Sequence, residues 1–224
     1  MKKMRNSILC LGALLLVAPL LRAQDYSKYR GFTLGASLAS VLKLNDQKLV
    51  DVKTIHARPL LIQELTWWPP SSSRAPSRPD SVEQMLFSFC DGKLYKISVT
   101  YDHSSTEGLT AGDMVKSISA EYGPATSVES EIDPVMNTLY NTKQSSLASW
   151  QDSQYSFDLV RSSLTDRFGL VIYSKQVNAE AELGITEAVK LEEQERPEKE
   201  ANQKKAEADD LEATRQKNQK TFHP

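Results

Sequence analysis

The chain has 224 residues, of which 27 are basic and 29 acidic, and 40% of the residues are hydrophobic. These values are ordinary for a globular protein and exclude a collagen, a small disulfide scaffold, a polytopic membrane protein and a wholly disordered chain. The formal net charge is −2. A nucleic-acid-binding protein needs clustered basic side chains to contact phosphates, so this charge disfavours a nucleic-acid partner.

The first 23 residues have the three-part layout of a secretory signal peptide. Three of the first five residues are basic, residues 8–21 are almost purely apolar, and Ala23 offers a small residue for cleavage. The apolar stretch is shorter than the roughly 20 residues that a membrane-spanning helix needs. We therefore predict an exported protein, periplasmic or extracellular, with no stable membrane span after cleavage. An uncleaved signal anchor is the alternative.

Removal of residues 1–23 would change both the charge and the cysteine content. Four basic residues and no acidic one would be lost, so the net charge would move from −2 to −6. Cys10 would be lost as well, which leaves Cys90 as the only cysteine and permits no internal disulfide. No cysteine directly follows the expected cleavage point, which disfavours a lipid anchor. The core alone must then stabilise the exported protein.

Two segments that lie 77 residues apart begin alike, since residues 31–35 read GFTLG and residues 108–112 read GLTAG. Each threonine stands where the hydroxyl of a helix N-cap residue is expected, and apolar residues follow at helical spacing. The second helix is expected to end at Gly123-Pro124. The pattern predicts two copies of one small unit that begins with a helix.

Segments rich in β-branched and aromatic residues follow each expected helix and predict antiparallel strands. These segments are 53–58, 60–68, 81–89 and 94–101 in the first copy, and 125–132, 147–154, 155–163 and 168–174 in the second. The predicted fold class is α+β, with tandem helix-plus-sheet modules that share one antiparallel sheet and pack their helices on one face. We place the first module at residues 24–107 and the second at 108–176.

The hairpin around Asp91-Gly92 permits a prediction of register. A two-residue turn would place Phe87 beside Lys96, whereas a three-residue loop over 90–92 pairs Phe87 with Tyr95. In the longer loop the apolar side chains share one face and the polar ones the other. The face is expected to carry Phe87, Phe89, Tyr95, Ile97 and Val99. We predict the three-residue loop, with Gly92 at positive φ.

The last part of the chain, residues 177–224, has a different composition. It holds twelve acidic and eight basic residues, and Phe222 is its only aromatic residue. Alanine, glutamate, glutamine and lysine favour a helix, but the apolar stripe is thin and Pro197 is expected to break or restart the helix. We predict a solvated tail that is helical or disordered. A partner-dependent coiled coil or a cell-wall tether is the alternative, although basic residues occupy its seam.

No pattern of residues in the chain predicts catalysis, a metal site or a bound cofactor. His56 and His103 have no further ligand at metal spacing, and the residues around Ser37 miss the pattern of a nucleophile elbow. No glycine-rich phosphate loop follows a strand. Cys90 is expected to be a structural thiol, with an intermolecular disulfide as the alternative. We therefore disfavour an enzyme and predict no cofactor.

The best candidate for a binding site is the pair Trp67-Trp68. The two indoles lie on opposite faces of one strand, so one is expected in the core and the other at the surface. Residues 69–79 follow with four prolines and four serines, which predicts an exposed loop. We take Trp67, Trp68, Arg74 and Arg78 as candidate partner-binding residues. The alternative is a tryptophan that the loop or the tail covers.

The order of signal peptide, Gly-x-Thr, amphipathic helix, Gly-Pro stop and antiparallel strands resembles the BamE-like outer-membrane assembly proteins. In tandem over residues 31–174, it resembles the β-lactamase inhibitor proteins, and with its charged C-terminal tail it is similar to other exported bacterial proteins. The chain departs from these families because it lacks their lipid-attachment cysteine or paired disulfides and because its first helix lacks the Gly-Pro stop.

The resemblance implies a protein-binding module rather than an enzyme. We expect a non-catalytic, exported interaction protein whose partner is another envelope protein. An exported hydrolase or small-ligand carrier, with a pocket between sheet and helices, is the alternative.

Overall fold

The computed structural model describes residues 24–69, 81–128, 134–137, 142–162 and 164–222. The expected signal peptide and nearly all of the proline- and serine-rich segment lie outside these residues.

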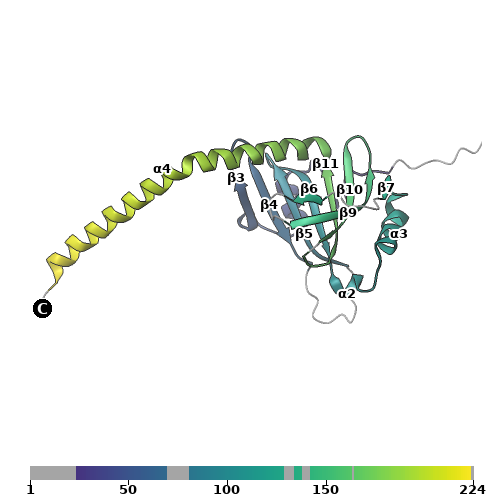
Figure 1. Cartoon of the computed structure of the whole chain (residues 1–224), viewed down its shortest axis with the longest axis horizontal. Helices are drawn as coiled ribbons and strands as arrows, with labels where there is room; N and C mark the ends of the chain where they lie inside the picture. Colours follow the sequence, from purple (N-terminus) through teal and green to yellow (C-terminus); the bar gives the residue numbers. More distant parts are fainter. Residues whose placement is uncertain (1–23, 70–80, 129–133, 138–141, 163, 223–224) are drawn as a thin grey trace, which may run out of the picture.

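Short helices, many strands and one long C-terminal helix make up the described part of the chain (Figure 1). The helices are α1 (Leu38–Leu44), the 3-10 helix η1 (Leu49–Asp51), α2 (His103–Thr106), α3 (Ala111–Tyr122) and α4 (Lys175–Thr221). The strands are β1 (Lys28–Tyr29), β2 (Phe32–Thr33), β3 (Val52–His56), β4 (Ile62–Trp67), β5 (Val82–Cys90), β6 (Lys93–Tyr101), β7 (Ser127–Val128), β8 (Pro134–Asn137), β9 (Thr142–Gln151), β10 (Tyr155–Ser162) and β11 (Phe168–Ser174).

Nine of these strands form one antiparallel sheet in the order β3-β4-β5-β6-β11-β10-β9-β7, and β8 also pairs with β9. The sheet is built from two meanders. The first meander follows α1 and consists of β3 to β6. The second meander follows α3 and consists of β7 to β11. The meanders meet where their last strands, β6 and β11, pair with each other. The predicted α+β class with one antiparallel sheet is confirmed.

The larger core lies on one face of the sheet, and both short helices contribute to it. Val41 from α1 and Met114 and Ile118 from α3 are buried in this core. The N-terminal hairpin β1-β2 joins them through Tyr29 and Phe32. Burial of these side chains, rather than the intrinsic stability of such short helices, holds α1 and α3 in place.

The helix α4 packs on the opposite face, where the sequence predicted a solvated tail. Ala181 and Ile185 are buried in a second cluster with Cys90 and Tyr95. Cys90 and Tyr95 directly neighbour Phe89 and Leu94, which belong to the larger core, and successive residues of a strand point to opposite faces. The expectation that the module helices share one face is confirmed for α1 and α3, and the C-terminal segment forms a long helix whose first part is docked on the sheet rather than solvated.

The helix α4 is continuous through Pro197, so the predicted break is wrong. Proline removes one hydrogen bond and favours a bend, and Figure 1 shows α4 changing direction beyond the sheet. We call residues 175–196 the docked half and residues 197–221 the distal half. Every residue of the distal half is exposed, and at 1.5 Å per residue this half is about 37 Å long.

The two expected helix starts have different outcomes. The Thr110 hydroxyl accepts a hydrogen bond from the Asp113 amide at 3.2 Å, and α3 ends at Gly123 with φ 78°, both as predicted. Thr33 is wrong as a cap, because Ser37 caps α1. Between them Gly35 has φ 87° and donates its N–H to the carbonyl of Leu94 at 2.7 Å. Because this part of the chain pairs with β6, the helix begins only at Leu38.

The hairpin between β5 and β6 has a two-residue turn, so the predicted three-residue loop is wrong. Phe89 pairs with Leu94, and a bulge follows, after which Phe87 pairs with Ile97 rather than with Tyr95. Asp91 and Gly92 both have positive φ, so the prediction for Gly92 is confirmed. Because of the bulge, the Tyr95 side chain points to the opposite face of the sheet, where α4 covers it. The apolar pattern of the sequence did not reveal that this second face is also partly buried.

The junction of the two meanders requires a glycine. A Cβ atom at Gly169 of β11 would lie 2.7 Å from the Val99 carbonyl oxygen of β6 and 3.3 Å from Cγ2 of Val160. Backbone cannot yield as a flexible side chain does, so a side chain here would push the two meanders apart.

We therefore expect Gly169→Ala to lower the free energy of unfolding by about 1–3 kcal/mol, the usual cost of overpacking a core. Gly112→Ala is the matched control, because its new Cβ would meet only the Thr110 hydroxyl at 3.7 Å at an exposed position of α3. This control should leave stability unchanged or raise it by up to about 1 kcal/mol. Urea titration measures both, and equal midpoints for Gly169→Ala and wild type would contradict the prediction.

Candidate functional site

The structure places one tryptophan of the predicted pair inside and one outside. Trp67 is partly buried and packs against the larger core, whereas the side chain of Trp68 is 60% exposed. The expected division between the two indoles is confirmed. Arg74 and Arg78 lie outside the described residues, so their part in a site stays a prediction.

Trp68 follows β4 at a corner of the sheet, and exposed apolar side chains also occur at the end of α1 and in η1, which precede β3. Leu44, Leu49 and Val50 are 60–83% exposed. The Gln47 amide donates a hydrogen bond to the Thr66 carbonyl at 3.0 Å and so holds the segment between α1 and β3 against the end of β4. We call Leu44, Leu49, Val50 and Trp68 the apolar corner. Single exposed apolar residues are normal, whereas a contiguous exposed patch is a typical feature of interaction sites, so we treat the apolar corner as a candidate site.

The strand beside the apolar corner, β3, is the terminal strand of the described sheet. Exposed sheet edges can recruit a further strand from another protein. Here β3 has only five residues, carries the exposed Lys53, and is interrupted by a register shift between Thr54 and His56. These features are the ordinary protection of an edge against strand addition. A partner at this corner would therefore contact side chains rather than extend the sheet.

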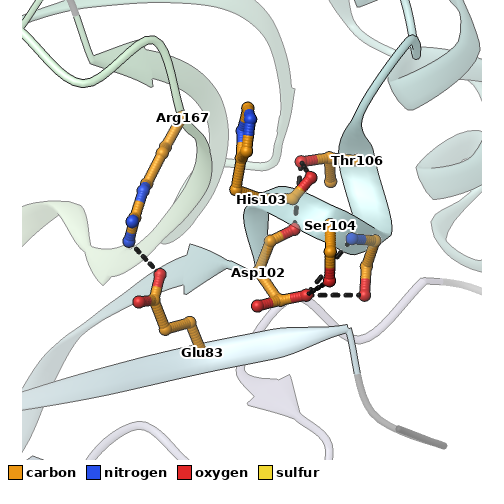
Figure 2. A network of polar contacts seen from close by, with 7 residues as sticks. Glu83, Asp102, His103, Ser104, Thr106 and Arg167 are labelled. Atoms are coloured by element: carbon orange, nitrogen blue, oxygen red, sulfur yellow. Dashed lines mark hydrogen bonds and ion pairs between the residues drawn. The ribbon is translucent and has the colours of Figure 1, made fainter. Parts of the chain in front are cut away.

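Asp102, His103 and Ser104 are the residue types of a catalytic triad, but their geometry is that of a helix cap. The Asp102 carboxylate accepts hydrogen bonds from the hydroxyl of Ser104 and from the amide of Ser105, the latter at 3.2 Å. Figure 2 shows the His103 ring directed away from this carboxylate. Asp102 therefore caps α2 and does not orient a histidine base.

An ion pair between Glu83 and Arg167 lies beside this cap (Figure 2). Glu83 is on β5 and Arg167 directly precedes β11, so the pair connects the two meanders at their junction. Its side chains are about one-third exposed. We assign it a structural role.

His56 belongs to the anchoring of α4. Its Nδ1 atom lies 3.0 Å from Oε1 of Glu192, and the Arg58 guanidinium pairs with Glu195. We call these two pairs the clasp. Among the described residues no group of three or more histidine, cysteine, aspartate or glutamate side chains is arranged to hold a metal ion.

Cys90 is buried and free. Burial raises the pKa of its thiol, and the nearby charges of Asp91 and Glu180 act in the same direction. The thiol is therefore protonated near neutral pH, which makes it a poor nucleophile.

A cavity of about 300 Å³ lies between α2, α3 and the β1-β2 hairpin. Tyr29, Tyr101 and Tyr122 line it together with Arg30 and Glu121. Burial raises the pKa of Tyr101 and of Tyr122, so both hydroxyls keep their protons near neutral pH. The lining can donate hydrogen bonds, and the volume is at the lower limit of small-molecule pockets.

Comparison of the chain with models of protein families, with curated proteins and with solved structures found no match. The structure shows an α+β protein whose nine-stranded antiparallel sheet carries α1 and α3 on one face and α4 on the other. None of the described helices combines the length and apolar character needed to cross a membrane.

The Arg58–Glu195 pair of the clasp predicts how the stability of the protein depends on pH. Hydrogen bonds from Arg58 and Lys199 lower the pKa of Glu195 below its ordinary value of 4.5. A lowered carboxyl pKa means that the stabilisation is complete above about pH 4.5 and is lost as the pH falls through the lowered pKa. Arg58→Ala should therefore lower the urea midpoint slightly near neutral pH, and the difference from wild type should disappear in acid. A difference that persists or grows below pH 3 would contradict this reading of the clasp.

Proposed function

We propose that the chain is an exported, non-catalytic protein-interaction module that binds another envelope protein through the apolar corner. The observation that carries the proposal is the exposure of Trp68 at the end of β4, the strand against which Gln47 holds the segment that joins Leu44 to the exposed Leu49 and Val50. The layout of residues 1–23 supports export, and the resemblance to exported binding modules supports the class of function.

The apolar corner suits protein recognition because Trp68, its largest side chain, follows directly on Trp67, which packs against the core. Trp67 therefore fixes the strand end from which Trp68 projects. Preorganised tryptophans often dominate binding energy, because a large apolar ring is buried at a small cost in side-chain entropy. The hydrogen bond from Gln47 restrains the other half of the corner in the same way.

A small-ligand carrier is the second candidate, and the tyrosine-lined cavity is the observation that favours it. A ligand there would be small and would carry acceptor groups for Arg30 and the tyrosine hydroxyls. The cavity and the apolar corner are lined by different residues, so variants can separate the two candidates.

We expect Val50→Ser combined with Trp68→Ser to weaken capture of the envelope partner at least tenfold, since a hot-spot residue contributes about 2 kcal/mol or more. The measurement is quantitative affinity capture of the partner from an envelope extract by purified wild-type and variant chains. Circular dichroism and urea titration should show that the variant is folded, because both side chains are exposed.

Two control variants sharpen this experiment. Leu183→Ser removes an equally exposed apolar side chain from the docked half of α4, where exposure is 73%, and should leave capture unchanged. Leu211→Ser, at 72% exposure in the distal half, tests the coiled-coil alternative. Loss of capture with Leu211→Ser but not with the corner variant would contradict the apolar corner as the binding site, as would absence of any captured envelope protein.

A further inference from the structure

The docked half of α4 makes few apolar contacts with the sheet. Its buried residues are Ala181, Gly184, Ile185 and Ala188, with Val177 partly buried, so Ile185 is the only large side chain among those that it buries. The sheet side of the cluster consists of Ile55, Leu60, Ile62, Cys90 and Tyr95. A fully developed helix-on-sheet contact would bury larger aliphatic side chains from the helix. The apolar attraction between α4 and the sheet is therefore limited.

Beside this apolar cluster, the sheet face on the α4 side carries polar residues. One row of residues in register crosses the central strands, from Glu64 on β4 through Ser88, Lys96 and Tyr173 to Ser156 on β10. Burial lowers the pKa of Lys96, and the negative charges of Glu182 and Glu64 oppose this shift. Covering a lysine therefore costs desolvation free energy, which the apolar contacts must offset.

The helix itself also buries a polar group without compensation. The Oδ1 atom of Asn178 is buried and has no hydrogen-bond partner among the described residues. Its Nδ2 atom donates to Glu182 of the same helix at 2.8 Å. A buried acceptor without a donor opposes docking, because it loses its hydrogen bond to water.

The two ends of the docked half are held differently. At the start, the Lys175 ammonium donates hydrogen bonds to Oε1 of Gln151 at 2.6 Å and to the Asp152 carbonyl at 2.7 Å, and its amide donates to Gln154. At the far end each pair of the clasp has one side chain that is more than half exposed, Glu192 beside the buried His56 and Arg58 beside Glu195. Ion pairs that water reaches contribute little. If α4 leaves the sheet, the Lys175 end is the expected hinge and the clasp is the end expected to open.

We infer that the docked half of α4 is a strap that leaves the sheet as one unit while the sheet stays folded. Release breaks the clasp, frees the whole helix from Val177 onward and uncovers the apolar side chains of Ile62, Cys90 and Tyr95. This surface is on the face of the sheet opposite the larger core, and the inference does not depend on the function proposed for the apolar corner.

Residue-resolved amide hydrogen exchange on the full chain tests the strap. We expect the amides of residues 181–192 to exchange faster than those of β5, β6 and β11, because release is easier than unfolding of the sheet. Arg58→Ala should speed exchange at 181–192 about two- to fivefold, the range set by an exposed ion pair, and leave the sheet strands unchanged. Arg215→Ala, which removes an exposed pair with Glu212 in the distal half, should change neither.

A disulfide that ties α4 to the rest of the protein distinguishes release of the whole docked half from fraying of single helical turns. A Cβ atom at Gly184 would lie 3.4 Å from Cβ of Leu60, close to the separation of about 3.5–4.5 Å in disulfides. In the double variant Leu60→Cys with Gly184→Cys, oxidation should slow exchange at residues 181–192 by a common factor, and reduction should restore it. Peptide mapping confirms the intended link.

Two results would overturn the strap. Residues 181–192 could exchange at the rate of the central strands, which would make α4 part of the global unfolding unit. Alternatively, oxidised and reduced double variants could exchange alike, in which case exchange occurs by fraying on a docked helix.

Discussion

The pairing of β6 with β11 is the contact on which the rest of the structure depends. Leu170 faces Val99 and Ile172 faces Ile97 across this pair, and all four side chains are buried in the larger core. Each meander ends at this junction, so without it each would present a long central strand as an unprotected edge. The close approach of the Val99 carbonyl to Gly169 shows how tightly the two backbones meet.

The N-terminal segment strengthens this dependence, because it precedes the first meander but packs on the second. The rings of Tyr26 and Tyr29 lie 5.6 Å and 6.4 Å from that of Phe157 on β10. The side-chain amide of Gln24 donates a hydrogen bond to the Glu121 carbonyl of α3 at 2.9 Å. Two helix-plus-sheet units of similar order therefore share one core, and neither buries its apolar face alone. At the other end β11 leads directly into α4, so the position of β11 also sets the path of the helix.

Sequence patterns predicted the local features and failed where distant segments meet. Thr110 and Gly123 were predictable as helix ends because capping depends on residues within one turn. Thr33 was not, because Gly35 pairs with Leu94, which is 59 positions away in the sequence. Tyr95 was assigned to the wrong face because one bulge residue reverses the alternation of side chains. In the candidate site the division between Trp67 and Trp68 was predictable from strand alternation. The place of Leu49 and Val50 was not, because it depends on contacts with β4, namely the pairing of Val52 with Leu65 and the hydrogen bond of Gln47 to Thr66.

Because the two meanders share one core, we expect them to unfold as one cooperative unit. Fluorine NMR of the fluorotryptophan-labelled chain during urea titration measures this, since Trp67 reports on the first meander and Trp150, which is fully buried, on the second. The native resonances of both tryptophans should disappear with one midpoint. Two separate midpoints, with one meander folded after the other has unfolded, would contradict this expectation.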